Sequence, residues 1–240
     1  MKAKIRLFVD YPLAEAQSVP LSQYQAHYLF SVMRKSEGDH IAIFDGKNGE
    51  WLAKIEMAEK KRGRVRSLEM TKPQQNPPDV WLMFAPIKKS RTDFIVEKAT
   101  ELGAARILPL QTDFTNSARI RRDRLQDHAI EAAEQCGGTF VPEVTDMNRL
   151  KKLLFDWPED RLLLFCDESK VGEMVEIHEL PKGKWAILVG PEGGFSKNER
   201  KYIQAMQNSF SLSLGPRILR TDTAAIAALT LWQKALGDWT

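Results

Sequence analysis

The segment Val80-Trp81-Leu82-Met83-Phe84-Ala85 is an unbroken apolar run of strand length, and the pattern that starts there decides the fold class. A helix is predicted over residues 91–102 and a second apolar strand over 106–110. Uniformly apolar strands that alternate with helices are typical of a parallel sheet covered on both faces. The alternation continues with helices predicted over 123–135, 150–155, 197–206 and 222–236, and with strands over 161–166, 185–189 and 211–214.

Capping residues mark the ends of two of these helices. Ser90 is predicted to cap the first helix, with Asp93 at the reciprocal capping-box position and Gly103 as the stop. Ser196 and Glu199 have the same spacing before a later helix. Both helices are therefore expected to begin directly after a loop that leaves a strand.

The first third of the chain has a different character. Residues 1–73 hold 13 Lys and Arg against 9 Asp and Glu, and much of that excess lies in the segment 60–66. Short strands are predicted over 41–44, 50–55 and 63–68, with one helix over 23–34 after Ser22 as its cap, which together describe a small β-barrel. The basic segment is either the solvated edge of a strand pair or a nucleic-acid surface.

A proline-rich polar linker, residues 71–79, separates the two patterns. We therefore expect a β-barrel domain over residues 1–73 and an α/β domain over 74–240. The 240 residues are 43% hydrophobic and 28% charged, which is the profile of a globular chain and excludes collagen and disordered classes.

Several function classes are disfavoured by what the sequence lacks. No apolar run reaches the roughly 18 residues that a membrane helix needs, and the start has no apolar segment of signal-peptide length, so we expect no membrane association. Cys136 and Cys166 form no CxxC motif and are expected to be buried thiols of a cytoplasmic protein. The four histidines show no ligand spacing, so no metal is expected.

Ligands of open α/β sheets bind at the carboxyl ends of the strands, so functional residues are expected in the loops that leave strands. The first is Gly190-Pro191-Glu192-Gly193-Gly194, whose glycines allow the backbone to approach a ligand closely. It has neither the Gly-Lys-Ser/Thr of a Walker A loop nor the GxGxxG spacing of a dinucleotide site. The loop therefore predicts a ligand site of another kind.

The second loop spans residues 214–224 and holds the apolar pair Ile218-Leu219 beside Arg220 and a predicted capping residue, Thr221. Apolar residues in a loop indicate either a wall for a flat apolar ligand or a plug in the core. The Ala-rich helix that follows, residues 224–229, allows another element to approach closely, which suits either tight internal packing or a subunit interface.

These two loops, with the segments before them, resemble the RsmE family of ribosomal RNA methyltransferases, members of the SPOUT class of S-adenosylmethionine-dependent enzymes. The resemblance runs nearly end to end and keeps its order. Its segments are Arg6-Leu7-Phe8, 27–39, Phe44-Asp45-Gly46, 94–103, 131–136, 141–144, 190–194 and 214–224. One departure is visible, because Asp222 stands where members commonly have Glu, so capping the helix or ordering the loop suits that side chain better than direct catalysis.

The resemblance implies a PUA-like RNA-binding β-barrel followed by a SPOUT α/β domain with a trefoil knot, assembled as a homodimer. It implies S-adenosylmethionine as cofactor, 16S ribosomal RNA or the small ribosomal subunit as partner, and methylation at N3 of one uridine. A methyltransferase of this architecture acting on another RNA, and a non-catalytic RNA-binding protein, are the alternatives. The implied cofactor-binding residues are Leu188, Gly190, Glu192, Gly193, Gly194, Leu214, Gly215, Ile218, Leu219 and Arg220.

N3 of uracil carries a proton and is a poor nucleophile until that proton leaves. Either a carboxylate removes it, for which Glu192 is the candidate, or a cation beside O2 or O4 stabilises the anion, for which Arg220 is the candidate. The target base must also be turned out of folded RNA. The expected phosphate contacts are Arg6, Arg34 and Lys35 in the first domain and Lys88, Lys89 and Arg91 in the second.

Overall fold

A computed structural model describes residues 4–117, 119–170 and 176–239. The chain divides into two compact units, which are described separately. Unit 1 comprises Met1–Asn76 with Ala133–Val141, and unit 2 comprises Pro77–Ala132 with Pro142–Thr240.

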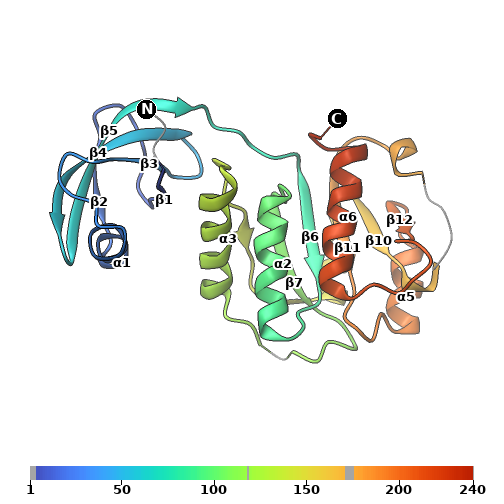
Figure 1. Ribbon diagram of the computed structural model, residues 1–240. Helices are drawn as coiled ribbons and strands as arrows, with labels where there is room; N and C mark the ends of the chain where they lie inside the picture. The colour runs from blue at the N-terminus through green and yellow to red at the C-terminus, as the bar shows by residue number, and fades with distance from the viewer. Residues whose placement is uncertain (1–3, 118, 171–175, 240) are drawn as a thin grey trace. The chain divides into compact units, whose positions relative to one another are not determined.

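Unit 1 is built on a five-stranded sheet with the order β1-β3-β4-β5-β2 (Figure 1). Strand β1 runs parallel to β3, and the other neighbours are antiparallel. Val19, Leu29, Ile41, Ile55 and Val65 lie in its core. The bounds are β1 Arg6–Phe8, β2 Ser18–Leu21, β3 His40–Phe44, β4 Glu50–Glu59 and β5 Arg62–Lys72.

The helix predicted over 23–34 has two parts. Ser22 and Gln25 form a capping box at the start of α1, Gln23–Ala26, and the chain then widens into a π-helical turn, His27–Val32. The predicted cap is therefore confirmed, while the uniform helix is not. A π turn adds one residue per turn, so it shifts the face that the following side chains present.

A charged network lies among the residues of unit 1. The Glu50 carboxylate, which is 8% exposed, is 2.5 Å from Arg6 Nε and 3.4 Å from Lys72 Nζ, and it accepts a hydrogen bond from Thr71 at 2.9 Å. Burial raises the pKa of Glu50, but the hydrogen bonds from Arg6 and Thr71 and the two positive charges outweigh burial, so the pKa lies below its ordinary value of 4.5. Ionised Glu50 therefore stabilises the fold.

We expect Glu50→Gln to lower the free energy of unfolding at neutral pH by about 3 kcal/mol, because it leaves the Arg6 guanidinium without its charge partner. Since folding lowers the pKa of Glu50, the stabilisation is present above pH 4.5 and is lost as the pH falls through the folded-state value. Urea unfolding of the full chain at pH 7 and at about pH 4 measures both effects. Glu56→Gln, in the exposed pair with Arg66, is the control. An equal loss in both variants would contradict the assignment.

Unit 2 contains a sheet with the order β12-β10-β11-β6-β7-β8, and β9 pairs with β7. All of these pairs are parallel, as the sequence predicts. The bounds are β6 Val80–Phe84, β7 Arg106–Gln111, β8 Glu143–Val144, β9 Asn148–Arg149, β10 Arg161–Cys166, β11 Lys184–Val189 and β12 Ser209–Leu212. Strand β12 begins and ends two residues before the predicted 211–214.

Helices cover both faces of this sheet. The last helix, α6 (Thr221–Ala235), packs on β11 and β6 beside α2 (Lys89–Glu101), and Figure 1 shows α3 (Arg122–Cys136) on the same side. On the opposite face, Leu150 and Leu154 of α4 (Leu150–Phe155) and Ile203 of α5 (Lys197–Gln204) join the core around Leu188. Short 3-10 turns lie at Glu168–Lys170 and Ile177–Glu179.

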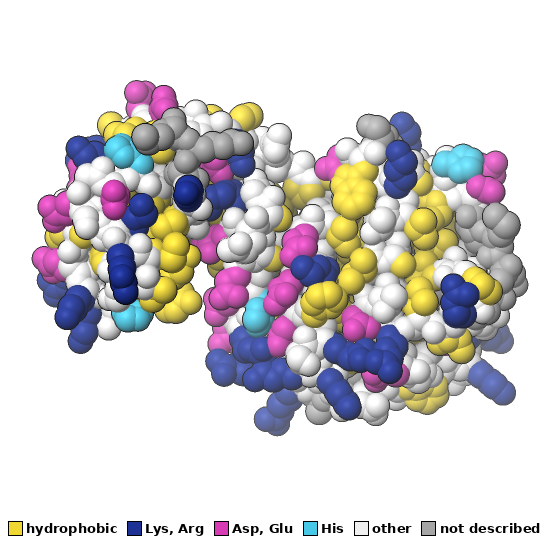
Figure 2. Space-filling model, viewed as in Figure 1, with side chains coloured by type: hydrophobic (Ala, Val, Ile, Leu, Met, Phe, Trp, Pro, Cys, Tyr) yellow, Lys and Arg dark blue, Asp and Glu magenta, His cyan; other side chains and the backbone are white. Residues whose placement is uncertain are grey.

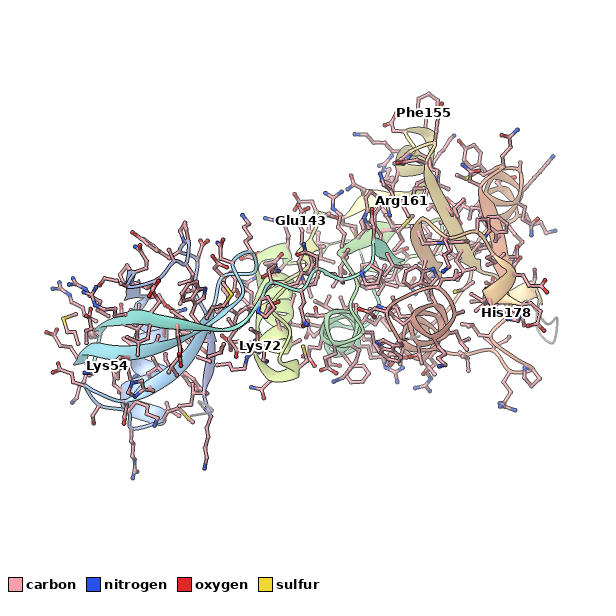
Figure 3. All side chains as sticks on the ribbon, turned by 90° about the horizontal axis from the view of Figure 1, so that it is seen from above. Lys54, Lys72, Glu143, Phe155, Arg161 and His178 are labelled. Carbon is pink, nitrogen blue, oxygen red and sulfur yellow. The ribbon has the colours of Figure 1, made fainter. Side chains whose placement is uncertain are left out.

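Two side chains at one edge of unit 2 are not explained by helix or strand patterns. Phe155 is 80% exposed at the end of α4, and Arg161 is buried at the start of β10 (Figure 3). The Arg161 guanidinium stacks 3.6 Å from the centre of the Trp81 ring and donates to Asp79 at 2.9 Å. Arg161 therefore holds together the starts of β10 and β6, away from the strand ends where ligands bind.

The structure also corrects the predictions for Ser90, Asp93 and Cys136. Ser90 lies inside α2, and Lys88 occupies the N-cap without a side-chain bond, because the Thr92 hydroxyl closes the turn with Ile87. Asp93 is ion-paired with Arg124 instead of completing a capping box. Cys136 is exposed, although Cys166 is buried as expected. The trefoil knot stays a prediction.

Candidate functional site

The site lies where three neighbouring strands of unit 2 end. Strands β10, β11 and β12 are adjacent, and the loops that follow them surround one hollow at the carboxyl edge of the sheet. Its lining comes from Cys166–Glu168 after β10, from 189–192 and Gly194 after β11, and from 212–215, 217–219, Thr221 and Ala224 after β12. The two loops chosen from the sequence are therefore brought together.

A side chain fastens these two loops to each other. The Thr221 hydroxyl donates to the Gly190 carbonyl at 2.9 Å, whereas the predicted capping role of Thr221 is wrong because Arg220 occupies the N-cap of α6. Gly190 has a steric reason to be glycine, since a Cβ there would lie 2.6 Å from the Phe195 ring. Ser196 and Glu199 form the predicted capping box and fix where the first loop enters α5.

An ionic network supports the floor of the hollow. Asp167, whose side chain is fully buried, pairs with Arg200 of α5 and accepts from Gln204 at 3.1 Å. Arg200 also donates to Glu168 at 2.7 Å, and Glu168 accepts from the Phe195 amide at 3.3 Å. Burial alone would lower the pKa of Arg200, but Glu168 and Asp167 raise it above its ordinary value. The network thus fixes the β10 loop to α5 and to the glycine loop.

The Cys166 thiol lines the same hollow. Burial, followed by the nearby Glu168 charge, raises the pKa of Cys166 to about 12. A thiol with this pKa stays protonated at neutral pH, and thiolate is the nucleophilic form of cysteine. Cys166 therefore serves as a neutral wall residue.

Several polar groups in the hollow lack partners within the described part of the chain. Ser213 Oγ is buried and makes no hydrogen bond there, and the backbone amides of Leu214, Gly215 and residues 217–219 donate to no described residue. Gly215 has a φ of +98°, and no heavy atom lies within 4 Å of the position of a Cβ. Unsatisfied polar groups inside a hollow indicate a ligand with hydrogen-bonding edges. An adenosyl group bound through its adenine edge fits this set.

Seven of the ten predicted cofactor residues line the hollow, namely Gly190, Glu192, Gly194, Leu214, Gly215, Ile218 and Leu219. Ile218 is 75% exposed, so the apolar pair is a wall of the hollow and not a plug in the core. Leu188 is fully buried in the core, Gly193 faces Phe114, and Arg220 is exposed outside the lining.

The β10 loop was missed by the sequence analysis. Cys166, Asp167 and Glu168 follow an apolar strand, but nothing in the pattern states that this strand is the neighbour of β11 and β12. The rule that ligands bind to the loops after adjacent parallel strands could have identified the loop after β10.

The predicted phosphate contacts differ in their surroundings. Arg6 is 13% exposed and donates to Glu50 and to the carbonyls of Ala133, Glu134 and Gly138 within unit 1, so its guanidinium is not available to RNA. Lys35 lies 3.7 Å from Asp39, and Arg34 is exposed with a φ of +53°.

In unit 2, Lys88 and Lys89 are exposed, while Arg91 is 3.2 Å from Asp222. Asp222 also accepts from the Thr223 amide, which supports a role in ordering the start of α6. Figure 2 shows Lys and Arg side chains gathering along the lower edge of unit 2, below α2 and α3 in Figure 1. Exposed Arg119 and Arg121 in the loop after β7 were not predicted as contacts.

The described residues lack two other kinds of feature. They contain no cluster of three or more His, Cys, Asp or Glu side chains that could hold a metal ion. None of their helices has both the length and the apolar character that crossing a bilayer requires.

Comparison with known proteins agrees with the geometry. Residues 74–233 match the model of an RNA methyltransferase domain, and residues 23–66 match that of an RNA methyltransferase PUA domain. Ribosomal RNA small subunit methyltransferase E of Rickettsia conorii is 32% identical over 93% of each chain, and that of Bacillus subtilis is 32% identical over 91% of this chain and 90% of the relative.

Solved structures give the same result for the fold. Ribosomal RNA small subunit methyltransferase E from Neisseria gonorrhoeae, bound to S-adenosyl methionine, superposes with a TM-score of 0.87 at 28% identity, covering 98% of this chain and 99% of that one. A methyltransferase structure from Legionella pneumophila, in complex with the same cofactor, superposes with a TM-score of 0.86 at 30% identity over 99% of this chain and 100% of the other.

Proposed function

The chain belongs to the ribosomal RNA small subunit methyltransferase E family, and on that premise we propose that it transfers a methyl group from S-adenosylmethionine to N3 of one uridine in 16S ribosomal RNA. The observation that carries the proposal is the hollow at the ends of β10, β11 and β12, where the Ser213 hydroxyl and several loop amides have no partner among the described residues. We further propose that residues 1–73 contribute RNA binding and that residues 74–240 carry the reaction.

S-adenosylmethionine supplies an electrophilic methyl group, and the electron pair of the breaking carbon–sulfur bond remains on sulfur while a nitrogen–carbon bond forms at N3. The protein has to align donor and acceptor and to manage the N3 proton. Alignment that makes the step effectively unimolecular lowers the barrier by about 7–11 kcal/mol. The hydrogen bond from Thr221 to Gly190 holds the two loops together, and these loops provide the rigid frame for the alignment.

We assign two side chains to the acceptor base. Glu192 lines the hollow and is exposed, and we propose that its carboxylate takes the N3 proton as a general base. Arg220 precedes Thr221 at the rim, is exposed, and has no carboxylate partner among the described residues. Its permanent charge suits stabilisation of the uracil oxygen that becomes negative as the proton leaves.

We also propose a homodimer in the cytoplasm. Phe94 of α2 and Leu231 of α6 are 40% and 44% exposed on two helices that pack side by side. Ala225 and Ala228 of α6 are buried within the chain, so the small face of α6 serves internal packing and the exposed apolar side chains carry the interface. Sedimentation equilibrium of the wild type and of Leu231→Glu tests this assembly.

A comparison of ribosomal RNA from cells with and without this protein tests the proposed function. Mass spectrometry of 16S fragments is expected to show one uridine that loses a single methyl group when the protein is absent. A complete and unchanged methylation pattern would overturn the proposal. A methyl group missing from a different RNA would support the proposed methyl transfer but assign it to a different substrate.

RNA binding is expected to depend steeply on salt, because Lys88 and Lys89 and the neighbouring arginines would displace counterions from phosphates. In the double variant Lys88→Ala/Lys89→Ala, the slope of log affinity against log salt should become shallower by about 1.5. Fluorescence anisotropy with a 16S fragment between roughly 50 and 200 mM salt measures it. Lys182→Ala/Lys184→Ala is a charge-matched control. A wild-type slope near zero would contradict the proposal that Lys and Arg side chains bind RNA phosphates.

A further inference from the structure

A second hollow lies beside the first and is built from a different set of strand ends. Its walls follow β6, β7 and β11, which are adjacent in the sheet order. It is a half-open hollow of about 370 Å³, a size within the range of small-molecule pockets. Its lining is Pro86, Ile87, Lys88, Lys89, Asn116, Ser117, Pro191 and Glu192.

The two hollows share a wall. Pro191 and Glu192 line both of them, because the loop after β11 lies between the loops after β10 and β12 on one side and those after β6 and β7 on the other. A group bound in the second hollow therefore lies next to a group bound in the first. Direct transfer between two bound molecules requires this adjacency.

The loop that carries Asn116 is held in place before it reaches the hollow. Thr112 donates its amide to the Thr115 hydroxyl at 2.8 Å, and the Asp113 amide donates to Glu199 at 2.9 Å. The Asp113 carboxylate accepts from Ser196, so this loop is tied to the start of α5. Asn116 follows these anchors and is exposed, and its side-chain amide bonds to no described residue.

The polar groups of the second hollow match a pyrimidine nucleotide. Lys88 and Lys89 lie within 4 Å of no carboxylate among the described residues, so both ammonium groups are available to a phosphate. Pro86 and Ile87 line the hollow and make part of its wall apolar. Glu192 presents an acceptor, and Asn116 presents an amide donor that bonds to no other residue in the described part of the chain.

Resting on the methyltransferase function proposed above, we propose that this second hollow receives the target uridine after it is turned out of the RNA, and that Asn116 is a specificity-determining residue. The Asn116 amide donates to O4 of uracil, while Glu192 accepts from the N3 proton. In cytosine, O4 is replaced by an amino donor and N3 carries a lone pair, so the Glu192 carboxylate faces a second acceptor. Because a buried polar group that loses its hydrogen-bond partner costs free energy, the second hollow should bind cytosine much more weakly than uracil.

Asn116→Ala tests the contact, with small ribosomal subunits that lack the modification as substrate. We expect kcat/KM to fall on the order of 10- to 100-fold while S-adenosylmethionine affinity, measured by calorimetry, stays within about twofold of wild type. Asn198→Ala, an exposed asparagine in the first turn of α5, is the matched control and should keep wild-type kcat/KM.

Asn116→Asp provides a readout that a structural role would not change. A carboxylate accepts from the cytosine amino group and repels O4 of uracil. In competition binding with 16S fragments that carry uridine or cytidine at the target position, the wild-type preference for uridine should shrink at least about tenfold in this variant. Unchanged discrimination together with unchanged kcat/KM in Asn116→Ala would overturn the assignment.

The two proposals fail separately. A wild-type protein that methylates no RNA would overturn the methyltransferase function and this inference with it. A wild-type protein that methylates 16S ribosomal RNA, with Asn116→Ala indistinguishable from Asn198→Ala, would overturn only the uridine pocket.

Discussion

Gly194→Ala is expected to weaken S-adenosylmethionine binding on the order of 100-fold. Gly194 has a φ of +69°, a conformation that costs a residue with a Cβ about 1–2 kcal/mol. The new Cβ would also overlap Glu168 Oε1, which is held by Arg200 and by the Phe195 amide. Glu168 cannot yield without releasing the glycine loop from the β10 loop, so the hollow loses its shape. Isothermal titration calorimetry measures the affinity.

Gly38→Ala is the control for Gly194→Ala, because it separates the effect of backbone strain from the effect of a distorted cofactor hollow. Gly38 lies in unit 1 with a φ of +89°, and no heavy atom lies within 4 Å of its Cβ position, so this variant carries the strain without the overlap. It should bind the cofactor as wild type does. Wild-type affinity in Gly194→Ala, with the chain folded by circular dichroism, would show that the glycine loop does not shape the cofactor site.

Arg220→Ala is expected to lower turnover by about 100- to 1,000-fold, the usual effect of removing one group that stabilises a developing negative charge. The residue is exposed and lies outside the lining of the cofactor hollow, so cofactor affinity should change by less than about threefold. Single-turnover transfer of labelled methyl to unmodified small subunits gives the rate, and calorimetry gives the affinity.

Arg220→Lys keeps the positive charge but loses the planar guanidinium with its several N–H donors. Its turnover should therefore lie between those of Arg220→Ala and the wild type. An Arg220→Ala variant with wild-type turnover would end the catalytic assignment. A variant that loses cofactor affinity and turnover in equal proportion would make Arg220 a binding residue instead.

The fold of unit 2 was predictable because its signals are local. Apolar runs of strand length such as Val80–Phe84 favour buried strands, and the Ser196–Glu199 spacing satisfies helix amides through local bonds. The Ser90 cap failed because its loop has a competitor, the Thr92 hydroxyl, which closes the same turn from inside the helix. Local patterns thus locate elements better than they locate the first residue of each.

The site was predictable only in part, for a related reason. Glycines and stranded apolar residues mark the loops after β11 and β12, but the loop after β10 joins them only through strand order, which is a tertiary property. Arg6 was predicted to contact RNA phosphates, but its guanidinium is engaged within unit 1. Its partner Glu50 lies on β4, a strand that does not pair with β1, so the pairing could not be read from sequence spacing.

A crystal structure of this protein grown with S-adenosylmethionine tests the central claim most directly. The account predicts adenosyl density in the hollow at the ends of β10, β11 and β12, with the adenine edge on the amides of residues 214–219 and the methyl group directed toward the Pro191–Glu192 wall. Cofactor density at any other place, with these loops empty, would contradict it.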